Sequence, residues 1–231
     1  MGLTGDTKNT YNSKDVILPF EKPDVEYNVE TISQLKSKPV YSFFKRLFDI
    51  AVSLIGIIVL LIPMIMVYVL IAATSEGNPI YKQERLGLNG KKFNIYKFRT
   101  MYINAESKGA QWSNGDDDDR ITPIGKFFRK TRIDELPQFL NCLKGDLSIV
   151  GPRPEREVFY NQFETYIHGF SQRMLVKPGI TGLAQVKGGY EFRPEEKIIY
   201  DIEYIKNRSL LWDLKILFST VYVVLSGDGA K

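Results

Sequence analysis

The pattern of apolar and polar residues divides the chain into three parts. Residues 1–41 are polar, are interrupted by prolines and show no sustained periodicity, which predicts a flexible or loosely docked extension. Residues 42–75 contain an uncharged run from Ile50 to Ala73, about 24 residues long, which matches a bilayer core of about 30 Å. Residues 76–231 mix apolar and charged positions. We therefore expect a membrane segment followed by a globular domain.

The membrane segment is broken at Pro63, which removes one helical hydrogen bond and kinks a helix. Each half is about 10 to 13 residues, or roughly 15 to 20 Å, which is too short to span a bilayer alone. Lysine and arginine mark the cytoplasmic side. Both flanks are basic, through Lys36, Lys38, Lys45 and Arg46 before the segment and Lys82, Arg85, Lys91, Lys92, Lys97 and Arg99 after it. We expect a re-entrant helix-break-helix that enters and leaves on one face, with a Pro-kinked spanning helix as the alternative.

Beyond the membrane segment the pattern predicts a short hairpin and several helices. Phe93, Ile95 and Phe98 follow the turn signal at residues 88–90 with the alternation of a strand. A basic helix is expected after Thr122, with Pro123 at its first position. The expected fold is α+β, mostly α, with a re-entrant membrane helix and a small cytosolic domain that contains the hairpin.

Composition and charge add little. The chain has 231 residues, a formal charge of +4 and a pI near 8.9, which suits an anionic partner such as a phosphate ligand or an acidic membrane surface. A single cysteine, Cys142, excludes an internal disulfide framework and gives no metal-ligand spacing. We expect the domain to face a reducing cytosol.

The segment "RKTRIDELPQFL", residues 129–140, places two adjacent carboxylates, Asp134 and Glu135, after a basic cluster. Thr131 and Asp134 have the spacing of a capping box, worth about 1 kcal/mol. Alternatively the carboxylates edge one catalytic site, since neighbours on a helix lie about 100° apart. At helical spacing the segment predicts an apolar stripe of Ile133, Leu136, Leu140 and Leu143, with Asp134, Gln138 and Asn141 on the opposite, polar face.

Three other segments carry candidate chemistry. Gly151, Pro152 and Pro154 form a stiff turn that presents Arg153, which can bind a phosphate bidentately. Lys177 precedes a glycine-bearing loop, "PGITG", that could contact a second anion. The run of aspartates at 116–119 is most simply a solvated loop, with an Asp-x-Asp metal site for a nucleotide sugar as the alternative.

Five motifs occur in an order that resembles the bacterial sugar transferases, the monotopic polyprenyl-phosphate phosphoglycosyltransferases. They are "KRLFD" before the Pro-broken segment, then "KFRTM", "RIDELPQFLNCLKGDLSIVGPRPE", "KPGITGLAQV" and "YDIEYIKNRSLLWDLKIL". The resemblance runs from about Lys45 to about Ser226 and leaves the extension uncovered.

The resemblance implies an activity and a set of residues. Such enzymes move a sugar 1-phosphate from a UDP-sugar to undecaprenyl phosphate and release UMP, as the first membrane step of capsule, exopolysaccharide or related glycan assembly. It implies Asp134 as the nucleophile that forms a phosphosugar intermediate in a ping-pong mechanism, and Glu135 as a catalytic residue. Glu135 and Asp134 would hold Mg²⁺, and the Pro-Arg-Pro turn maps onto Pro152, Arg153 and Pro154. It also implies a re-entrant helix on the cytoplasmic membrane with the catalytic domain on the cytoplasmic face.

The break departs from the family pattern, because Ile62 precedes Pro63 where the family commonly has serine, and Ser53 is the nearest substitute. The reaction requires positive groups that offset the negative charge of the donor phosphates. Candidates for this role are Arg99, Arg129, Arg132, Arg153 and Lys177.

The C-terminal segment, 209–225, is expected either in the membrane interface, with Trp212 near the headgroups, or as a packed core helix. His168 is assigned no role, and Cys142 is assigned to packing.

Two rival functions remain at the sequence level. A metal-dependent glycosyltransferase using the aspartate run would release UDP instead of UMP, but residues 1–75 leave no room for a preceding nucleotide-binding half. A membrane adaptor held by its basic flanks would bind anionic lipid without turnover. No nucleic acid is expected as a partner, while the sugar, the glycan pathway and self-association as a homo-oligomer stay open.

Overall fold

The structure of the chain is a computed structural model that describes residue 18 and residues 21–107, 109–112, 118–188 and 192–226. The helices are α1 (Pro39–Thr74), α2 (Pro123–Lys130), α3 (Gln138–Lys144), α4 (Glu157–Glu164), α5 (Leu183–Gly188), α6 (Pro194–Asn207) and α7 (Leu210–Ser226). The strands are β1 (Tyr27–Asn28), β2 (Ile80–Leu86), β3 (Lys92–Phe98), β4 (Ser148–Val150), β5 (Ile167–His168) and β6 (Gly179–Thr181). Short 3-10 turns, η2 (Leu88–Gly90), η4 (Ile133–Glu135) and η5 (Phe170–Leu175), join them. The fold is α+β and mostly helical, as the sequence predicts.

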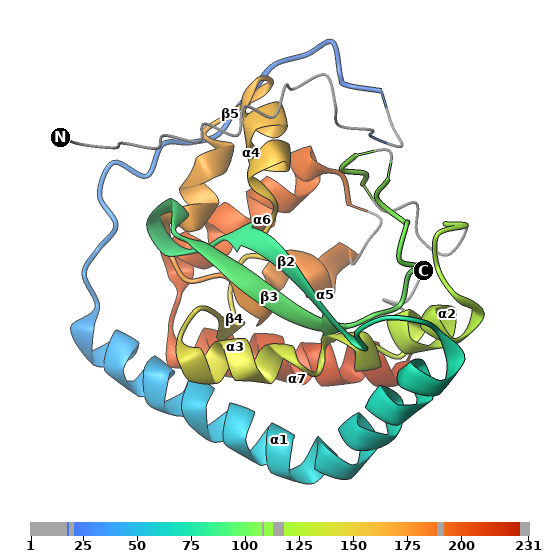
Figure 1. Cartoon of the computed structure of the whole chain (residues 1–231). Coiled ribbons are helices and arrows are strands. Elements are labelled where there is room, and N and C mark those ends of the chain that lie inside the picture. Colours follow the sequence, from blue (N-terminus) through green and yellow to red (C-terminus); the bar gives the residue numbers. More distant parts are fainter. Residues whose placement is uncertain (1–17, 19–20, 108, 113–117, 189–191, 227–231) are drawn as a thin grey trace, which may run out of the picture.

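One long bent helix, α1, contains the apolar membrane segment. It has 36 residues with Pro63 inside it, and Figure 1 shows it bent so that both ends rise toward the rest of the molecule. A proline inside a helix is the usual cause of such a kink. The most apolar part of α1 has a mean hydropathy of 3.1, yet only 11% of it is buried. Most of its apolar surface is therefore free to contact lipid.

Buried carboxylates attach the first half of α1 to the domain. Asp213 on α7 accepts hydrogen bonds from Tyr41 at 2.9 Å and from Tyr204 at 2.8 Å, and pairs with Lys45 at 3.0 Å. Asp49 accepts from the hydroxyl of Ser148 and from the neighbouring backbone amide, both at 2.9 Å. These bonds satisfy charges that would be costly to bury alone, so this half of α1 has a fixed position on the domain.

Ser53 does not take the place of the serine missing before Pro63. It lies in the first half of α1 and is fully buried on the domain side. Ile62, beside the proline, is 71% exposed. The residues at the bend, Ile62 and Pro63, are therefore exposed.

The predicted hairpin is confirmed. β2 and β3 pair antiparallel from Ile80 opposite Phe98 to Leu86 opposite Lys92, and η2 makes the turn. Phe93 and Ile95 face the main core, as the alternation predicts, whereas Phe98 packs in a second cluster with Val67, Ile71 and Phe128. The hairpin thus connects the domain core to the second half of α1.

The helix α3 is buried by its polar face, which corrects the predicted stripe. Gln138 and Asn141 are almost fully buried, whereas Leu140 is 43% exposed. Asn141 accepts from the amide of Tyr96 at 2.9 Å and donates to the carbonyl of Asn94 at 2.7 Å, so it bonds to strand β3. A buried polar face is stable when its groups are paired in this way. The segment is also interrupted, because η4 and Pro137 precede α3.

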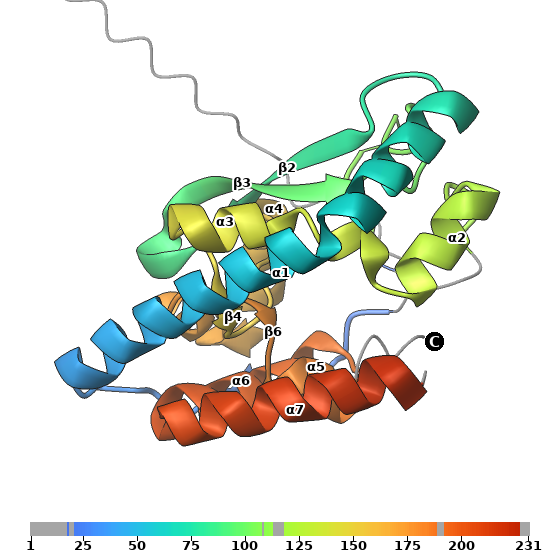
Figure 2. The same ribbon diagram turned by 90° about the horizontal axis from the view of Figure 1, so that it is seen from below.

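The underside of the domain is apolar. Seen from below in Figure 2, α1 and α7 both lie on this side. On α7, Leu211, Phe218 and Tyr222 are 79%, 72% and 69% exposed, while Ile216 on the other face is buried. Trp212 instead packs against the main core, and its indole Nε1 is buried. Trp212 is thus partly buried on the inward side of α7, and the expectation that it lies near the headgroups stays a prediction.

The described part of the extension lies along the domain. β1 pairs in parallel with β5, and the amide of Ile32 donates to Gln172 at 2.6 Å. Further on, Arg208 donates to the carbonyl of Lys36 at 2.7 Å. Residues 21–38 therefore lead into α1 along the surface of the globular domain.

Candidate active site

The two adjacent carboxylates lie on the 3-10 turn η4, between α2 and α3. Thr122 caps the start of α2, with its hydroxyl oxygen accepting from the amide of Gly125 at 3.0 Å. At the other end the hydroxyl of Thr131 donates to the carbonyl of Phe127 at 2.8 Å, and no side chain caps η4. The capping-box interpretation of Asp134 is therefore wrong, because Thr131 ends the preceding helix.

The backbone is strained just before the dyad. Arg132 adopts the left-handed conformation, with φ 59° and ψ 13°, which costs about 1–2 kcal/mol for a residue with a side chain. Asp134 and Glu135, which follow it, are only 6% and 7% exposed. Strain of this kind is typical of functional sites, where it is held by surrounding contacts.

Glu135 is held by two cations. Lys97 from β3 pairs with its carboxylate at 2.8 Å, and Arg153 from the loop after β4 pairs with the same oxygen and donates to the other at 3.4 Å. Burial alone would raise the pKa of Glu135, but Arg153 and Lys97 outweigh it and lower this pKa well below its usual range. Glu135 is therefore ionised at neutral pH, and its ion pairs hold Lys97 and Arg153 in position.

Asp134 has a different environment. Within the described part of the chain its carboxylate has no hydrogen-bond or ion-pair partner, and it lines a cavity. Burial raises the pKa of Asp134 to about 6; Lys97 opposes this rise and the charge of Glu135 adds to it. At neutral pH the carboxyl group is thus mostly ionised, poorly solvated and not hydrogen-bonded to any described residue. These are the properties of an available nucleophile.

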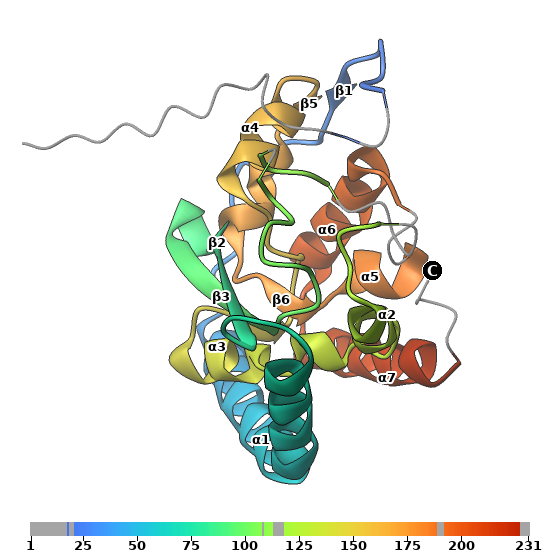
Figure 3. The same ribbon diagram turned by 45° about the vertical axis from the view of Figure 1, so that its right-hand side comes forward.

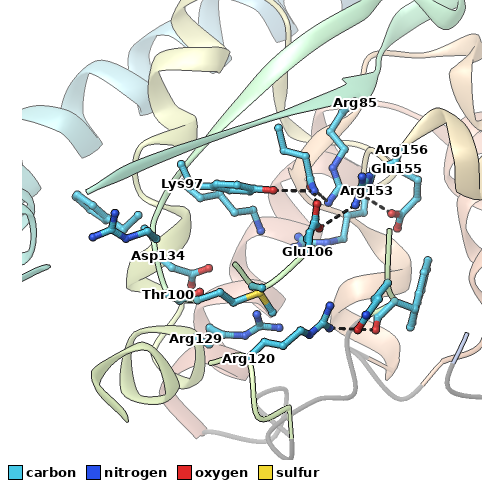
Figure 4. A pocket seen from close by; sticks show the side chains of 18 of the residues that line it. Arg85, Lys97, Thr100, Glu106, Arg120, Arg129, Asp134, Arg153, Glu155 and Arg156 are labelled. Carbon is cyan, nitrogen blue, oxygen red and sulfur yellow. Dashed lines mark hydrogen bonds and ion pairs between the residues drawn. The ribbon is translucent and has the colours of Figure 1, made fainter. Parts of the chain in front are cut away.

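The cavity beside Asp134 is large and positively charged. Its volume is about 1290 Å³, which suits a ligand of nucleotide-sugar size. Among the described residues that line it, twelve are arginine or lysine and three are carboxylates. In Figure 4, Asp134, Lys97 and Arg129 lie on one side of it, and Arg153, Glu155 and Arg156 lie on the other. This arrangement favours a polyanionic ligand.

The Pro-Arg-Pro turn aims Arg153 at Glu135. Pro152 and Pro154 are buried and do not line the cavity; their carbonyls accept from Gly179 at 2.9 Å and from Arg85 at 3.2 Å. The carbonyl of Arg153 itself accepts from Arg173 at 2.9 Å. The two prolines therefore act by positioning Arg153.

Beneath this turn, Arg173 forms a fully buried ion pair with Asp201 at 2.6 Å, each side chain being 1% exposed. The glycines of "PGITG" pack here too, since a Cβ on Gly179 would lie 2.1 Å from the amide nitrogen of Gly151. These glycines permit the close approach of β4 and β6. They support the turn and do not form an anion loop.

The other predicted anion-binding residues have different positions. Arg129 and Arg132 line the cavity, as does Arg99, which also donates to the carbonyl and hydroxyl of Ser75 at 2.9 and 2.8 Å. Arg99 thereby ties the end of α1 to the site. Lys177 is not among the lining residues; it lies near Gly145 and Arg46. The prediction that Lys177 helps bind the donor therefore finds no support in the geometry.

The aspartate run is only partly described, since residues 116 and 117 lie outside the described residues. Asp118 is buried and accepts from the guanidinium of Arg120 at 2.7 Å, while Asp119 is exposed. The described residues contain no group of three or more metal-ligating side chains.

His168 and Cys142 lie outside the site. His168 is exposed and pairs with Glu26, and Cys142 is buried, which raises its pKa to about 12. Cys142 packs in the main core.

Sequence reasoning missed Lys97 as a site residue and assigned it only to a basic flank. A signal was present, because Phe93 and Ile95 face inward and Lys97 follows at the same period of two. Arg173 and Lys197 were also missed. They come to the cavity from η5 and α6, and nothing in their local sequence indicates this.

Comparisons with known proteins identify a family. A family model described as bacterial sugar transferase matches residues 40–227. The chain is 44% identical over 203 residues to a UDP-N-acetylgalactosamine-undecaprenyl-phosphate N-acetylgalactosaminephosphotransferase of Aeromonas hydrophila, covering 87% of this chain and 48% of that protein. It is 42% identical over 185 residues to a UDP-glucose:undecaprenyl-phosphate glucose-1-phosphate transferase of Klebsiella pneumoniae, covering 78% and 39%.

A shorter relative matches over more of its length. The chain is 52% identical over 135 residues to a protein of Bacillus subtilis named as an undecaprenyl-phosphate N-acetylgalactosaminyl 1-phosphate transferase, covering 58% of this chain and 74% of the relative. The chain thus spans about half or less of the first two relatives and most of the third.

Proposed function

The chain belongs to the bacterial sugar transferase family, and from this premise we propose that it transfers a sugar 1-phosphate from a UDP-sugar to undecaprenyl phosphate and releases UMP. The observation that carries the proposal is the contrast within the dyad. Lys97 and Arg153 pair with Glu135, whereas Asp134 is buried, has no hydrogen-bond or ion-pair partner among the described residues, and faces a cationic cavity. The product would begin a capsule, exopolysaccharide or related glycan.

In the first half of the reaction, an Asp134 oxygen attacks the sugar-bearing phosphorus of the donor. The bond from this phosphorus to the bridging oxygen breaks, and that oxygen leaves with UMP. An anion attacking a diphosphate is repelled unless positive groups offset the charge. Lys97 and Arg153, fixed by Glu135, and Arg129 and Arg132 at the same cavity are placed to do this.

In the second half, an oxygen of undecaprenyl phosphate attacks the phosphorus of the aspartyl-phosphosugar, and the carboxylate of Asp134 leaves. Donor and acceptor would use one site in turn, which gives ping-pong kinetics. The site can serve a lipid phosphate because the exposed apolar faces of α1 and α7 lie on one side of the domain (Figure 2). We place this side in the cytoplasmic face of a bacterial membrane, with α1 as a re-entrant helix. The bend of α1 and its two basic flanks support this topology.

The residues present fit a magnesium ion. Mg²⁺ is typically held by one or two carboxylates together with substrate phosphates, and Asp134 with Glu135 provides two adjacent carboxylates. When bound, the ion would neutralise charge on the phosphates and on the leaving group.

The nucleotide that is released tests this proposal. Purified protein with Mg²⁺, a panel of UDP-sugars and undecaprenyl phosphate should release UMP. Asp134→Asn should abolish the release and Glu135→Gln should lower it by roughly 100-fold or more. Asp119→Asn, which alters an exposed carboxylate of the aspartate run, is the matched control and should change it less than twofold. Release of UDP, or loss of activity in the control alone, would contradict the proposal.

A further inference from the structure

The cavity has a second end that the chemistry at Asp134 does not use. Arg156 lies over the ring of Phe159 with its guanidinium carbon at 5.9 Å, and Phe159 packs edge to face on Trp112 with ring centroids 5.0 Å apart. Lys197 on α6 completes the series, with its ammonium 4.9 Å from the Trp112 ring centroid. In Figure 4, Arg156 lies across the cavity from Asp134. Trp112 and Lys197 therefore belong to the side of the cavity away from the nucleophile.

Lys197 is a cation without a bonded counter-charge. Within the described part of the chain its ammonium has no hydrogen bond or ion pair, and it lines the cavity. The two nearby carboxylates are already committed, because Glu155 pairs with Arg85 at 2.9 Å and Asp201 pairs with Arg173 at 2.6 Å. An anionic ligand in the cavity would provide the negative charge that Lys197 lacks among the described residues.

The electrostatics of Lys197 agree with this geometry. Burial lowers the pKa of Lys197 to about 8; Glu155 opposes this, while Arg173 and Arg153 lower the pKa further. Arg153 thus acts electrostatically on Lys197 and also forms an ion pair with Glu135, the neighbour of Asp134. A diphosphate at Arg153 would reach toward Asp134 on one side and Lys197 on the other.

We propose that Lys197 and the apolar wall of Trp112 and Phe159 form the subsite for the nucleoside monophosphate part of the donor. This inference rests on the proposed function. When the bond to the bridging oxygen breaks, that oxygen remains on the nucleotide and its phosphate gains a negative charge. Lys197 is placed to stabilise this leaving phosphate, and the aromatic wall beside it accommodates the base.

The position of α6 favours the nucleotide over the lipid phosphate as the ligand of Lys197. In Figures 1 and 3, α6 lies above α5 and α7, on the side of the domain away from the bend of α1. A lipid phosphate has to remain at the level of the headgroups, near α1 and α7. A water-soluble nucleotide has no such restriction.

The test is calorimetric titration of UMP into the detergent-solubilised full chain. Lys197→Met should weaken UMP binding by about tenfold or more, and Lys197→Arg should restore most of it. Lys206→Met is the matched control, since Lys206 lies on the same helix and pairs with Glu30 outside the cavity. The KM for undecaprenyl phosphate should stay within twofold in all three variants.

Proton uptake gives a readout that a purely structural role would not change. With its pKa lowered to about 8, Lys197 is partly deprotonated near pH 8 and takes up a fraction of a proton when an anion binds. Titrations in buffers of different ionisation enthalpy should show this uptake in the wild type and its loss in Lys197→Met. Unchanged UMP affinity and proton uptake would overturn the proposal. A raised KM for the lipid acceptor alone would reassign Lys197 to that phosphate.

The two proposals fail in different ways. Release of UDP by the wild type would refute the proposed function, whatever Lys197→Met does. Release of UMP by the wild type, with UMP binding unchanged in Lys197→Met, would refute only the subsite.

Discussion

At the scale of single residues, the site depends on two neighbouring carboxylates with opposite surroundings. Lys97 and Arg153 stabilise the charge of Glu135, whereas burial leaves that of Asp134 poorly stabilised. The sequence predicted the pair and Arg153, because their motifs are local. It did not predict the partnership with Lys97, since that contact joins β3 to η4 across 38 positions of the chain.

Asp134→Asn should remove turnover while making the protein more stable. Because its pKa is raised, ionised Asp134 destabilises the folded state, and this penalty grows as pH rises from about 4 through about 6. At pH 8 the variant should gain about 1–3 kcal/mol in free energy of unfolding. At pH 4 the gain should vanish. Denaturant unfolding at both pH values measures this difference. A loss of stability at pH 8 would show that the ionised carboxylate of Asp134 does not destabilise the folded state.

The rate of UMP release should depend on pH through Asp134. The ionised carboxylate is the attacking form. Its pKa is raised to about 6 in the metal-free protein and bound Mg²⁺ would lower it, so the rate of the first half-reaction should rise with pH to a plateau reached at or below about pH 6. Rapid-quench measurements between pH 4.5 and 8 test this. A rate that stays constant across the range would argue against Asp134 as the titrating nucleophile.

At the scale of elements, the sequence correctly predicted those helices and strands whose ends are set by nearby turn and cap residues. The hairpin and the start of α2 at Pro123 follow from turn and cap residues. The buried face of α3 was predicted wrongly, because Asn141 bonds to β3 and this tertiary pairing overrides its polarity. The inward orientation of Trp212 was not predicted either. Apolar residues occur on all sides of α7, so their periodicity does not indicate which side packs on the core.

The turn that carries Arg153 should depend on the buried pair below it. Arg173→Lys keeps the charge but cannot bond both Asp201 and the carbonyl of Arg153, so the turn should shift. We expect kcat to fall by about tenfold, with the KM for the donor changed less than threefold. Arg208→Lys, another buried arginine outside the cavity, is the control. Equal losses in both variants would indicate general destabilisation instead of positioning.

At the scale of the whole molecule, the arrangement brings a cationic cavity and an apolar underside together on one small domain. Asp49 and Asp213 attach the bent α1 to the domain. The position of α1 therefore determines the orientation of the cavity relative to the apolar underside. The sequence predicted the membrane segment from its length and lack of charge. The angle between its halves could not be predicted, because it depends on packing against the hairpin and α2.

Membrane association should weaken when the exposed face of α7 is made acidic. Leu211→Glu with Phe218→Glu places two charges on side chains that are 79% and 72% exposed, where the apolar surface would otherwise be buried in lipid. Binding to liposomes containing anionic lipid should fall by at least fivefold. Ile199→Glu, at an exposed position on α6 away from this side, should leave binding unchanged. Equal binding of both variants would mean that α7 does not contact the membrane.

The most direct test of the covalent mechanism is the intact mass of the protein after incubation with Mg²⁺ and UDP-sugars, without undecaprenyl phosphate. We predict a mass increase equal to one sugar phosphate with a single donor, located on Asp134 by peptide mapping and absent from Asp134→Asn. Such an adduct would also identify the sugar. No adduct with any donor, together with UMP release only after the lipid is added, would contradict the aspartyl intermediate and indicate direct transfer.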